Sequence, residues 1–589
     1  MASKHYASFI SEAFIKPIRS VLIVDDDYPT IEDMVDLEIR HAGDNSARRN
    51  GKKWYDSPDR IKNVIENFRQ PEYSLLVDIH DGRNVDAKGD AKIASHLHQS
   101  DLLVLDYELD KTRPGDGYRA IEILRSLMDN DHFNLVVVHT SEKLDVVYRD
   151  IITGLLSPID IALTDEDRRK CQDLIAERED VDERFAASLE AAMGADQYLH
   201  LRLLPAQYSP LIAKKHQPYA GFSDLADAAE WDDDNRKLVG RYLLDRVQQR
   251  LRGNMNRSEV KNMRWSTSSV RWIKTDSNFI AFSEKGDDDN LLGDLQIALE
   301  AWKPQPSRLF MAKLRAEIDE YGVVAQTDAL DRKFASARWY SGLLNAEKYD
   351  RRWRIAETVK RHSDQLLRTI LPRVETFATE LIKAEKASGT SHAICKDHFG
   401  VDLNETKAAE RADLEHNAYV GSTAPHGWHL YTGDVLAIGD EYWLCLSPAC
   451  DLVPGQSNKR YQIYGNRRPF MAVKLFPVTD RPLKKIKVQA NLHIFIDVDG
   501  DTKIFSFNAQ GSEGTAPTWR TFYAEKHGVF DEDSFTLKVA MPRGGKRRLI
   551  YDREVATVVA QLRYEYALNL LQKLGASMTR IGLDFVGGT

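Results

Sequence analysis

The chain is poor in cysteine and has no apolar run of membrane-spanning length. Its four cysteines among 589 residues are scattered, which argues against an extracellular domain held by disulfides. No apolar stretch approaches the roughly 20 residues of a transmembrane helix, and the N-terminus lacks a signal-peptide core. The net charge of −9 and pI near 6.1 lack the basic bias of a dedicated nucleic-acid-binding protein, although they leave such binding open. We therefore expect a cytoplasmic protein without a membrane partner.

Three short apolar runs near the N-terminus each end in a polar residue. The first precedes Asp25 and Asp26, the second precedes Asp106, and the third precedes His139 and Thr140. Their surroundings alternate between strand and helix patterns: strand 20–25, helical stretches within 30–69, strand 74–79, helix 90–99, strand 101–106, helix 117–129 and strand 134–139. Alternation of this kind predicts a doubly wound parallel sheet, in which the carboxyl ends of the strands share one edge. Ligands and active sites gather at that edge in open α/β sheets.

These residues resemble the receiver domain of bacterial two-component response regulators. The resemblance rests on the acid pair Asp25 and Asp26, on the strand ending at Asp106, on the motif Gly115-Asp116-Gly117 before the next helix, and on Thr140. It implies a flavodoxin-like fold in which Asp106 accepts a phosphoryl group from the phosphohistidine of a partner kinase. It also implies that Thr140 is a switch hydroxyl, and that Mg²⁺ is held by Asp25, Asp26, Asp106 and the backbone carbonyl of Glu108.

The chain departs from the receiver pattern in two places. Polar residues from 40 to 60 interrupt the first crossover and predict a surface insertion. No strand ending in a Lys-Pro pair follows Thr140 at the ordinary distance, although receivers use such a lysine to contact the phosphoryl group. Lys214 and Lys215 are candidates, but Lys285 has the better context, because it follows the apolar run 278–283 and precedes a helical pattern at 291–299. The alternative is that Lys285 is an ordinary exposed lysine in a turn.

Changes of pattern divide the chain into four predicted regions. Residues 1–160 form the receiver core, and 161–304 form a helical insertion that could supply the last receiver strand and helix. Residues 305–425 are helical, with breaks expected at Gly322 and Gly342. Residues 426–589 form a β-rich, barrel-like domain. Its last segment, 554–581, has the apolar spacing of a long amphipathic helix.

Two weaker constellations suggest other chemistry. His392, Cys395 and His398, with Cys445 and Cys450 from the β region, could hold zinc, although their spacing matches no standard motif. The alternative is that they are scattered polar residues and buried thiols. The stretch 361–368 faintly resembles the phosphoacceptor helix of sensor kinases, with His362 as the acceptor, whereas an exposed helical histidine is the simpler interpretation.

The sequence favours a response regulator that is not itself an enzyme. It would signal through contacts with a protein target or effector, change its oligomeric state, or drain phosphate from the kinase. Receivers with unusual insertions resemble parts of anti-phage defence systems of two-component type. The alternative is a receiver-gated effector whose C-terminal half acts on or binds nucleic acid.

Overall fold

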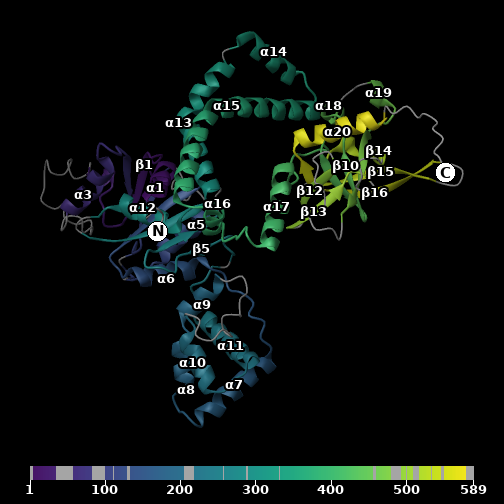
Figure 1. Ribbon diagram of the computed structural model, residues 1–589. Coiled ribbons are helices and arrows are strands. Elements are labelled where there is room, and N and C mark those ends of the chain that lie inside the picture. Colours follow the sequence, from purple (N-terminus) through teal and green to yellow (C-terminus); the bar gives the residue numbers. More distant parts are fainter. Residues whose placement is uncertain are drawn as a thin grey trace. The chain divides into compact units, whose positions relative to one another are not determined.

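The computed structural model divides the chain into two compact units, Met1–Ala316 and Glu317–Thr589 (Figure 1). The structure describes residues 4–34, 58–82, 100–110, 112–113, 115–128, 133–203, 218–256, 258–286, 289–330, 332–455, 459–478, 492–498, 500–508, 516–531, 534–544 and 549–578. The predicted helix 90–99, most of the predicted insertion at 40–60, and both Lys214 and Lys215 lie outside these residues. Within the described residues, no helix has the length and apolar character needed to cross a membrane.

A seven-stranded sheet forms the centre of the first unit. Its order is β2 (Leu76–His80), β1 (Ser20–Val24), β3 (Leu102–Asp106), β4 (Asn134–Thr140), β7 (Asn278–Glu284), β6 (Trp272–Lys274) and β5 (Arg264–Trp265). The first five strands run parallel, whereas β6 and β5 add an antiparallel edge. Every residue of β3 and β4 is buried, which explains why both strands are continuous apolar runs in the sequence. The predicted doubly wound α/β sheet is confirmed.

The helices next to the sheet bury one apolar stripe each. They are α1 (Lys4–Ile10), α3 (Pro58–Arg69), α5 (Tyr118–Met128), α6 (Leu144–Leu155) and α12 (Leu291–Trp302). Helix α5 buries Ala120, Ile123, Leu124 and Leu127, which follow the spacing of one helix face. The crossover helices thus cover the faces of the sheet, and loops surround the ends of its strands.

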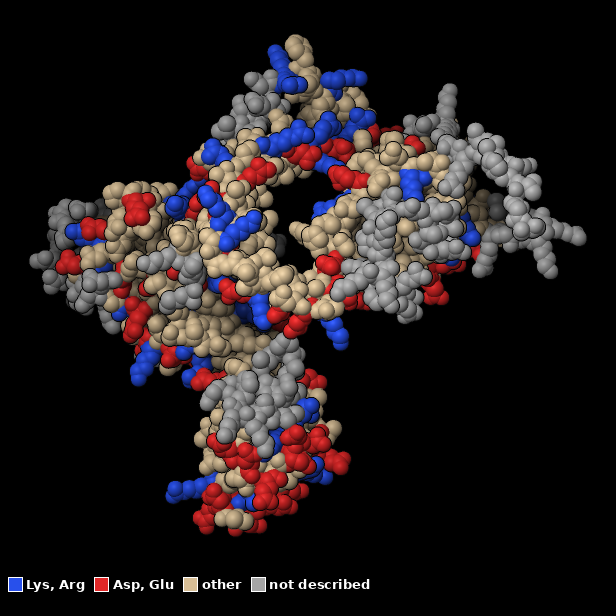
Figure 2. Space-filling view, in the orientation of Figure 1, with Lys and Arg blue, Asp and Glu red and all other residues tan. Residues whose placement is uncertain are grey.

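A helical lobe interrupts the chain between α6 and the last three strands of the sheet. It contains α7 (Asp165–Glu179), α8 (Phe185–Ala192), α9 (Ala195–Arg202), α10 (Ala220–Ala228) and α11 (Asp233–Leu251). Thr164 begins α7 with a capping box, in which its side chain and that of Asp167 each accept the other's backbone N–H. The apolar core of the lobe is continuous with that of the sheet and α6. Acidic side chains gather on the outer surface of this lobe (Figure 2).

Long helices begin the second unit. They are α13 (Pro306–Leu330), which starts in the first unit, α14 (Lys333–Leu344), α15 (Lys348–Ser388), α16 (Ser391–Phe399) and α17 (Thr406–Gly421). The expected breaks at Gly322 and Gly342 are wrong, because α13 and α14 continue through them. A glycine inside a helix costs only about 1 kcal/mol, which neighbouring turns can offset.

A closed β-sheet forms the C-terminal half of the second unit. Its main strands are β9 (Asp434–Ile438), β10 (Glu441–Cys445), β11 (Arg468–Pro477), β12 (His493–Val498), β13 (Asp501–Ser506), β14 (Trp519–Ala524), β15 (Thr536–Gly544) and β16 (Leu549–Leu562), and the short β8 (Ser422–Thr423) pairs with β16. The sheet closes because β11 pairs with both β14 and β10. Leu436, Trp443, Phe470 and Phe522 are among the residues of its interior. The predicted β-rich domain is therefore confirmed.

The predicted helix over 554–581 is wrong in its first half. Residues up to Leu562 belong to β16, and only Tyr564–Met578 form a helix, α20. Along β16 the buried side chains include Ala556, Val558, Ala560 and Leu562, which alternate as a strand requires. Two of these four residues are alanines, which mark a buried strand face only weakly. The larger apolar residues of this segment happen to have helical spacing, so the sequence predicted a helix.

Candidate functional site

The register of the parallel strands brings four of the predicted residues to one edge of the sheet. Val24 of β1 is paired with Leu105 of β3, so Asp25 and Asp106 follow neighbouring positions. Asp106 is in turn paired with His139 of β4, and Thr140 is paired with Glu284 of β7. Lys285 comes directly after β7, and its N–H donates a hydrogen bond to the Thr140 carbonyl at 2.7 Å.

Lys285 lies between two carboxylates. Its Nζ is 2.9 Å from Asp25 Oδ2 and 3.0 Å from Asp106 Oδ2. The three side chains are almost inaccessible, with 9% of Lys285, 3% of Asp25 and 6% of Asp106 exposed. A buried ammonium bridging two buried carboxylates is a paired arrangement, which is how charges are tolerated in protein interiors. Lys285 is therefore not an exposed turn lysine.

Burial changes the proton affinities of this bridge. Burial raises the pKa of the Asp106 carboxyl to about 7, and Asp25 acts in the same direction while Lys285 opposes it. Burial alone would lower the pKa of Lys285, but the carboxylates of Asp25 and Asp106 outweigh it and raise that pKa. The ammonium therefore stays protonated, and it is the fixed cation of the site.

The two oxygens of Asp106 have different environments. Oδ2 contacts the Lys285 ammonium, whereas the one hydrogen bond that Oδ1 accepts from the described residues is a long one of 3.4 Å from the Glu108 N–H. The Glu108 side chain turns toward the next loop, where its Oε1 accepts the Gly115 N–H at 2.5 Å. Thr140 is fully buried, and its hydroxyl accepts the Glu142 N–H at 3.0 Å.

Consecutive acids after β1 provide the donor set for a divalent cation. Carboxylate oxygens of Asp25, Asp26 and Asp27 lie within 4.8 Å of one another, and this is the only such group that the described residues contain. Hard carboxylate oxygens are the ligands that Mg²⁺ prefers, so these residues fit that ion. Asp27 was not among the predicted ligands, although it continues the same acidic run. Asp106 lies outside this group, and its ligand role and that of the Glu108 carbonyl stay predictions.

Gly117 of the Gly-Asp-Gly motif is required by packing. A Cβ at Gly117 would lie 1.9 Å from Cε2 of Tyr107, which follows Asp106 in the chain. The Tyr107 hydroxyl donates to Asp150 of α6 at 2.9 Å. The absence of a side chain at Gly117 therefore leaves room for the Tyr107 ring. The Tyr107 hydroxyl in turn links the end of β3 to α6.

A buried pair next to the site was not predicted from the sequence. His139, the residue before Thr140, has its Nε2 3.0 Å from Asp289 Oδ2, and both side chains are at most 3% exposed. Burial alone would raise the pKa of Asp289, but the His139 ring and a hydrogen bond from the Gly286 N–H lower it. The two residues are 150 positions apart, so no local signal connects them.

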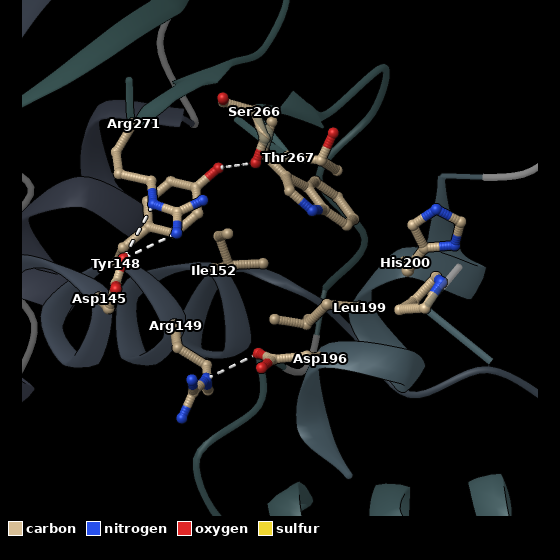
Figure 3. A pocket seen from close by; sticks show the side chains of 12 residues that line it. Asp145, Tyr148, Arg149, Ile152, Asp196, Leu199, His200, Ser266, Thr267 and Arg271 are labelled. Atoms are coloured by element: carbon tan, nitrogen blue, oxygen red, sulfur yellow. Dashed lines mark hydrogen bonds and ion pairs between the residues drawn. The ribbon is translucent and has the colours of Figure 1, made fainter. Parts of the chain in front are cut away.

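Helix α6 is held on another side by the lobe and by the edge hairpin. A pocket of about 410 Å³ lies there, lined by residues of α6, α9 and the β5–β6 hairpin (Figure 3). Arg271 bonds to Asp145 through two nitrogens at 2.7 and 3.0 Å, and Arg149 bonds to Asp196 at 3.0 Å. The Tyr148 hydroxyl donates to the Ser266 carbonyl at 2.6 Å. The helix that follows Thr140 is thus attached to the inserted segments by polar bonds.

The weaker constellations do not assemble. His392, Cys395 and His398 form no metal-binding group with the other described residues, and His398 instead contacts Glu385 at 2.6 Å. Cys445 and Cys450 belong to no such group either, so the zinc hypothesis is wrong for these described residues. His362 is exposed on α15, as the simpler interpretation expected.

The N-terminal part of the chain matches a known protein family. Residues 17–183 match the family model described as Response receiver domain. This match includes β1, β3 and β4 together with Asp25, Asp106 and Thr140, but it ends before β7 and Lys285. A search of the curated proteins and of the solved structures found no match. Residues 17–183 are therefore a response receiver domain, whose sheet in this chain continues into β7.

Proposed function

We propose that the chain is a response regulator in which Asp106 accepts a phosphoryl group from the phosphohistidine of a partner histidine kinase. The observation that carries this proposal is the bridge of Lys285 between Asp106 and Asp25. A phosphoryl group carries negative charge on its equatorial oxygens, so an anionic nucleophile needs fixed cations around it. Lys285 supplies one such cation at 3.0 Å from the proposed nucleophile.

The transfer uses the less engaged oxygen of Asp106. Oδ1 attacks phosphorus, the P–N bond to the donor imidazole breaks, and its electron pair returns to the imidazole, which takes up a proton from solvent. The product is an aspartyl phosphate, with Lys285 beside the other carboxyl oxygen.

The acids after β1 would hold the Mg²⁺ that receiver domains use. Asp25 and Asp26 are buried and Asp27 is partly buried, so they offer oxygen ligands in a site with little competing water. When bound, Mg²⁺ would neutralise charge on the phosphoryl oxygens and add to the field of Lys285.

The proposed response passes from Thr140 to α6 and then to the lobe. Thr140 ends β4, α6 begins at Leu144, and the bonds of Tyr148 and Arg149 connect this helix to the inserted segments. A shift of the Thr140 hydroxyl toward a phosphoryl oxygen would therefore act on a helix with partners on two other elements. The protein target would recognise the resulting change.

Phosphorylation of the full chain tests the proposal. Incubation with acetyl phosphate and Mg²⁺ should add the mass of one phosphoryl group, and Asp106→Asn should abolish the addition. Asp116→Asn is the matched control, because Asp116 is 40% exposed in a nearby loop. Labelling that persists in Asp106→Asn would refute the assignment. If Asp106 is labelled, phosphoryl transfer from a purified histidine kinase would identify the donor.

A further inference from the structure

Helix α14 has an outward face that the rest of the described chain leaves uncovered. Leu343 is the one buried residue of this helix among the described residues. Phe334 is 88% exposed, Leu344 is 63% exposed and Tyr340 is 56% exposed. Apolar side chains exposed together at this level are typical of interaction surfaces rather than of a finished monomer surface.

The inward face of α14 is already used. Trp339 Nε1 donates to the hydroxyl of Thr358 on α15 at 2.8 Å, and Leu343 is buried on the same side of the helix. At 100° per residue, Phe334 points almost directly away from this side, and the exposed residues Lys333, Arg338, Tyr340 and Leu344 flank it. We name these five residues, Lys333, Phe334, Arg338, Tyr340 and Leu344, the α14 face.

The α14 face is basic in an acidic protein. Helix α14 contains no acid, and both of its cations, Lys333 and Arg338, are exposed and have no acidic partner within 4 Å among the described residues. Between 332 and 373 the sequence has eleven lysines and arginines and four acids, which gives +7, whereas the whole chain carries −9. Lysine and arginine side chains gather over α14 and α15 (Figure 2).

We propose that the α14 face binds single-stranded nucleic acid. Charge complementarity selects an anionic partner, and Phe334 and Tyr340 offer rings on which unpaired bases can stack between phosphate contacts at Lys333 and Arg338. Eight of the eleven basic residues between 332 and 373 are arginines, which combine phosphate binding with stacking. An anionic membrane fits less well, because on the α14 face basic residues alternate with apolar ones instead of lying opposite them.

Fluorescence anisotropy with the full chain tests this proposal. The probes are labelled single strands of RNA and of DNA, of about 20 nucleotides and mixed sequence, together with the matching duplexes. Single strands should bind more tightly than duplexes, and the two single-strand probes separate an RNA site from a DNA site. The double variant Phe334→Ala, Tyr340→Ala should weaken binding about thirtyfold or more, because each of the two stacked rings contributes at least about fivefold.

A charge variant gives a second and independent measurement. Lys333→Gln with Arg338→Gln should reduce the slope of log K against log salt by about 1.4, because two phosphate contacts are lost. Trp519→Ala, which removes a ring that is 45% exposed on β14, and Lys62→Gln, at a lysine that is 67% exposed on α3, are the matched controls and should leave binding unchanged.

Several results would overturn the proposal. These are the absence of binding, equal or tighter binding of duplexes, or binding that neither α14 variant weakens. Binding to phosphatidylserine vesicles without binding to single strands would assign the face to a membrane. A loss of self-association in the α14 variants, without nucleic-acid binding, would assign it to a second copy of the chain. The substituted side chains are exposed, so both variants should keep the melting temperature of the parent.

Discussion

Replacing Lys285 by methionine should destabilise the first unit and make its stability depend on divalent cations. The substitution removes the ammonium but keeps most of the apolar stem, so two carboxylates that are 3% and 6% exposed lose the cation between them. Removing one partner of a buried ion pair costs about 3–5 kcal/mol, and the low exposure leaves little water to take over. We therefore expect a loss of about 3 kcal/mol in the free energy of unfolding.

Thermal unfolding measures this loss. A unit of this size loses about 2 °C in melting temperature for each kcal/mol, so the melting temperature should fall by about 6 °C. Added Mg²⁺ should restore part of the loss, because at a hundredfold excess over its Kd a ligand of the folded state contributes about 2.7 kcal/mol. Lys62→Met is the matched control, because Lys62 pairs only with the exposed Glu66 among the described residues and its loss should change stability by less than about 0.5 kcal/mol.

An unchanged transition in Lys285→Met would refute the reasoning, because it would mean that the ammonium is not the partner of both acids. Equal stabilisation of parent and variant by Mg²⁺ would not contradict the bridge of Lys285 between the two acids. It would, however, show that the cation and Lys285 do not compete for the same carboxylates.

Three further predictions concern other parts of the chain. Gly117→Ala should cost about 1–3 kcal/mol through its clash with the Tyr107 ring, and a double variant with Tyr107→Ala should cost less than the sum of the two in denaturant unfolding. Tyr148→Phe should cost about 1–3 kcal/mol in the same assay, because the buried Ser266 carbonyl loses its donor at 2.6 Å, and an unchanged midpoint would contradict that bond. Burial raises the pKa of Asp434 from 3.8 to about 7, so the folded state holds a proton that the unfolded chain releases. The stability of the second unit should therefore fall by up to about 4 kcal/mol as the pH rises from about 4 to 7, and Asp434→Asn should flatten this slope in melting curves taken across that range.

The receiver half could be predicted from the sequence because its signals are local. Central parallel strands are buried on both faces, so β3 and β4 appear as unbroken apolar runs that end at Asp106 and Thr140. The order of these runs was enough to place their ends at one edge. The strand and helix on either side of Lys285 also left a local pattern.

The parts that local pattern could not predict depend on distant contacts. The pairing of β4 with β7 decides that Lys285, rather than Lys214 or Lys215, follows the strand beside Thr140, and the span of 141–277 between them hides that pairing. The contact of His139 with Asp289 has the same origin. In β16, small alanines on the buried face concealed the strand period, so a helix was predicted where a strand lies.

Because β7 comes late in the sequence, it is synthesised well after its neighbour β4. About 140 residues of lobe and hairpin must leave the ribosome after β4 before its parallel neighbour exists, which takes about 7–30 s at 5–20 residues per second. During that time one edge of β4 has no strand beside it, and the loop that finally closes is long. A fragment cut at residue 183, where the family match ends, would keep that edge open permanently and would lack Lys285. A shortened version that keeps the complete receiver sheet, Lys285 and the helix that follows them therefore has to extend through α12.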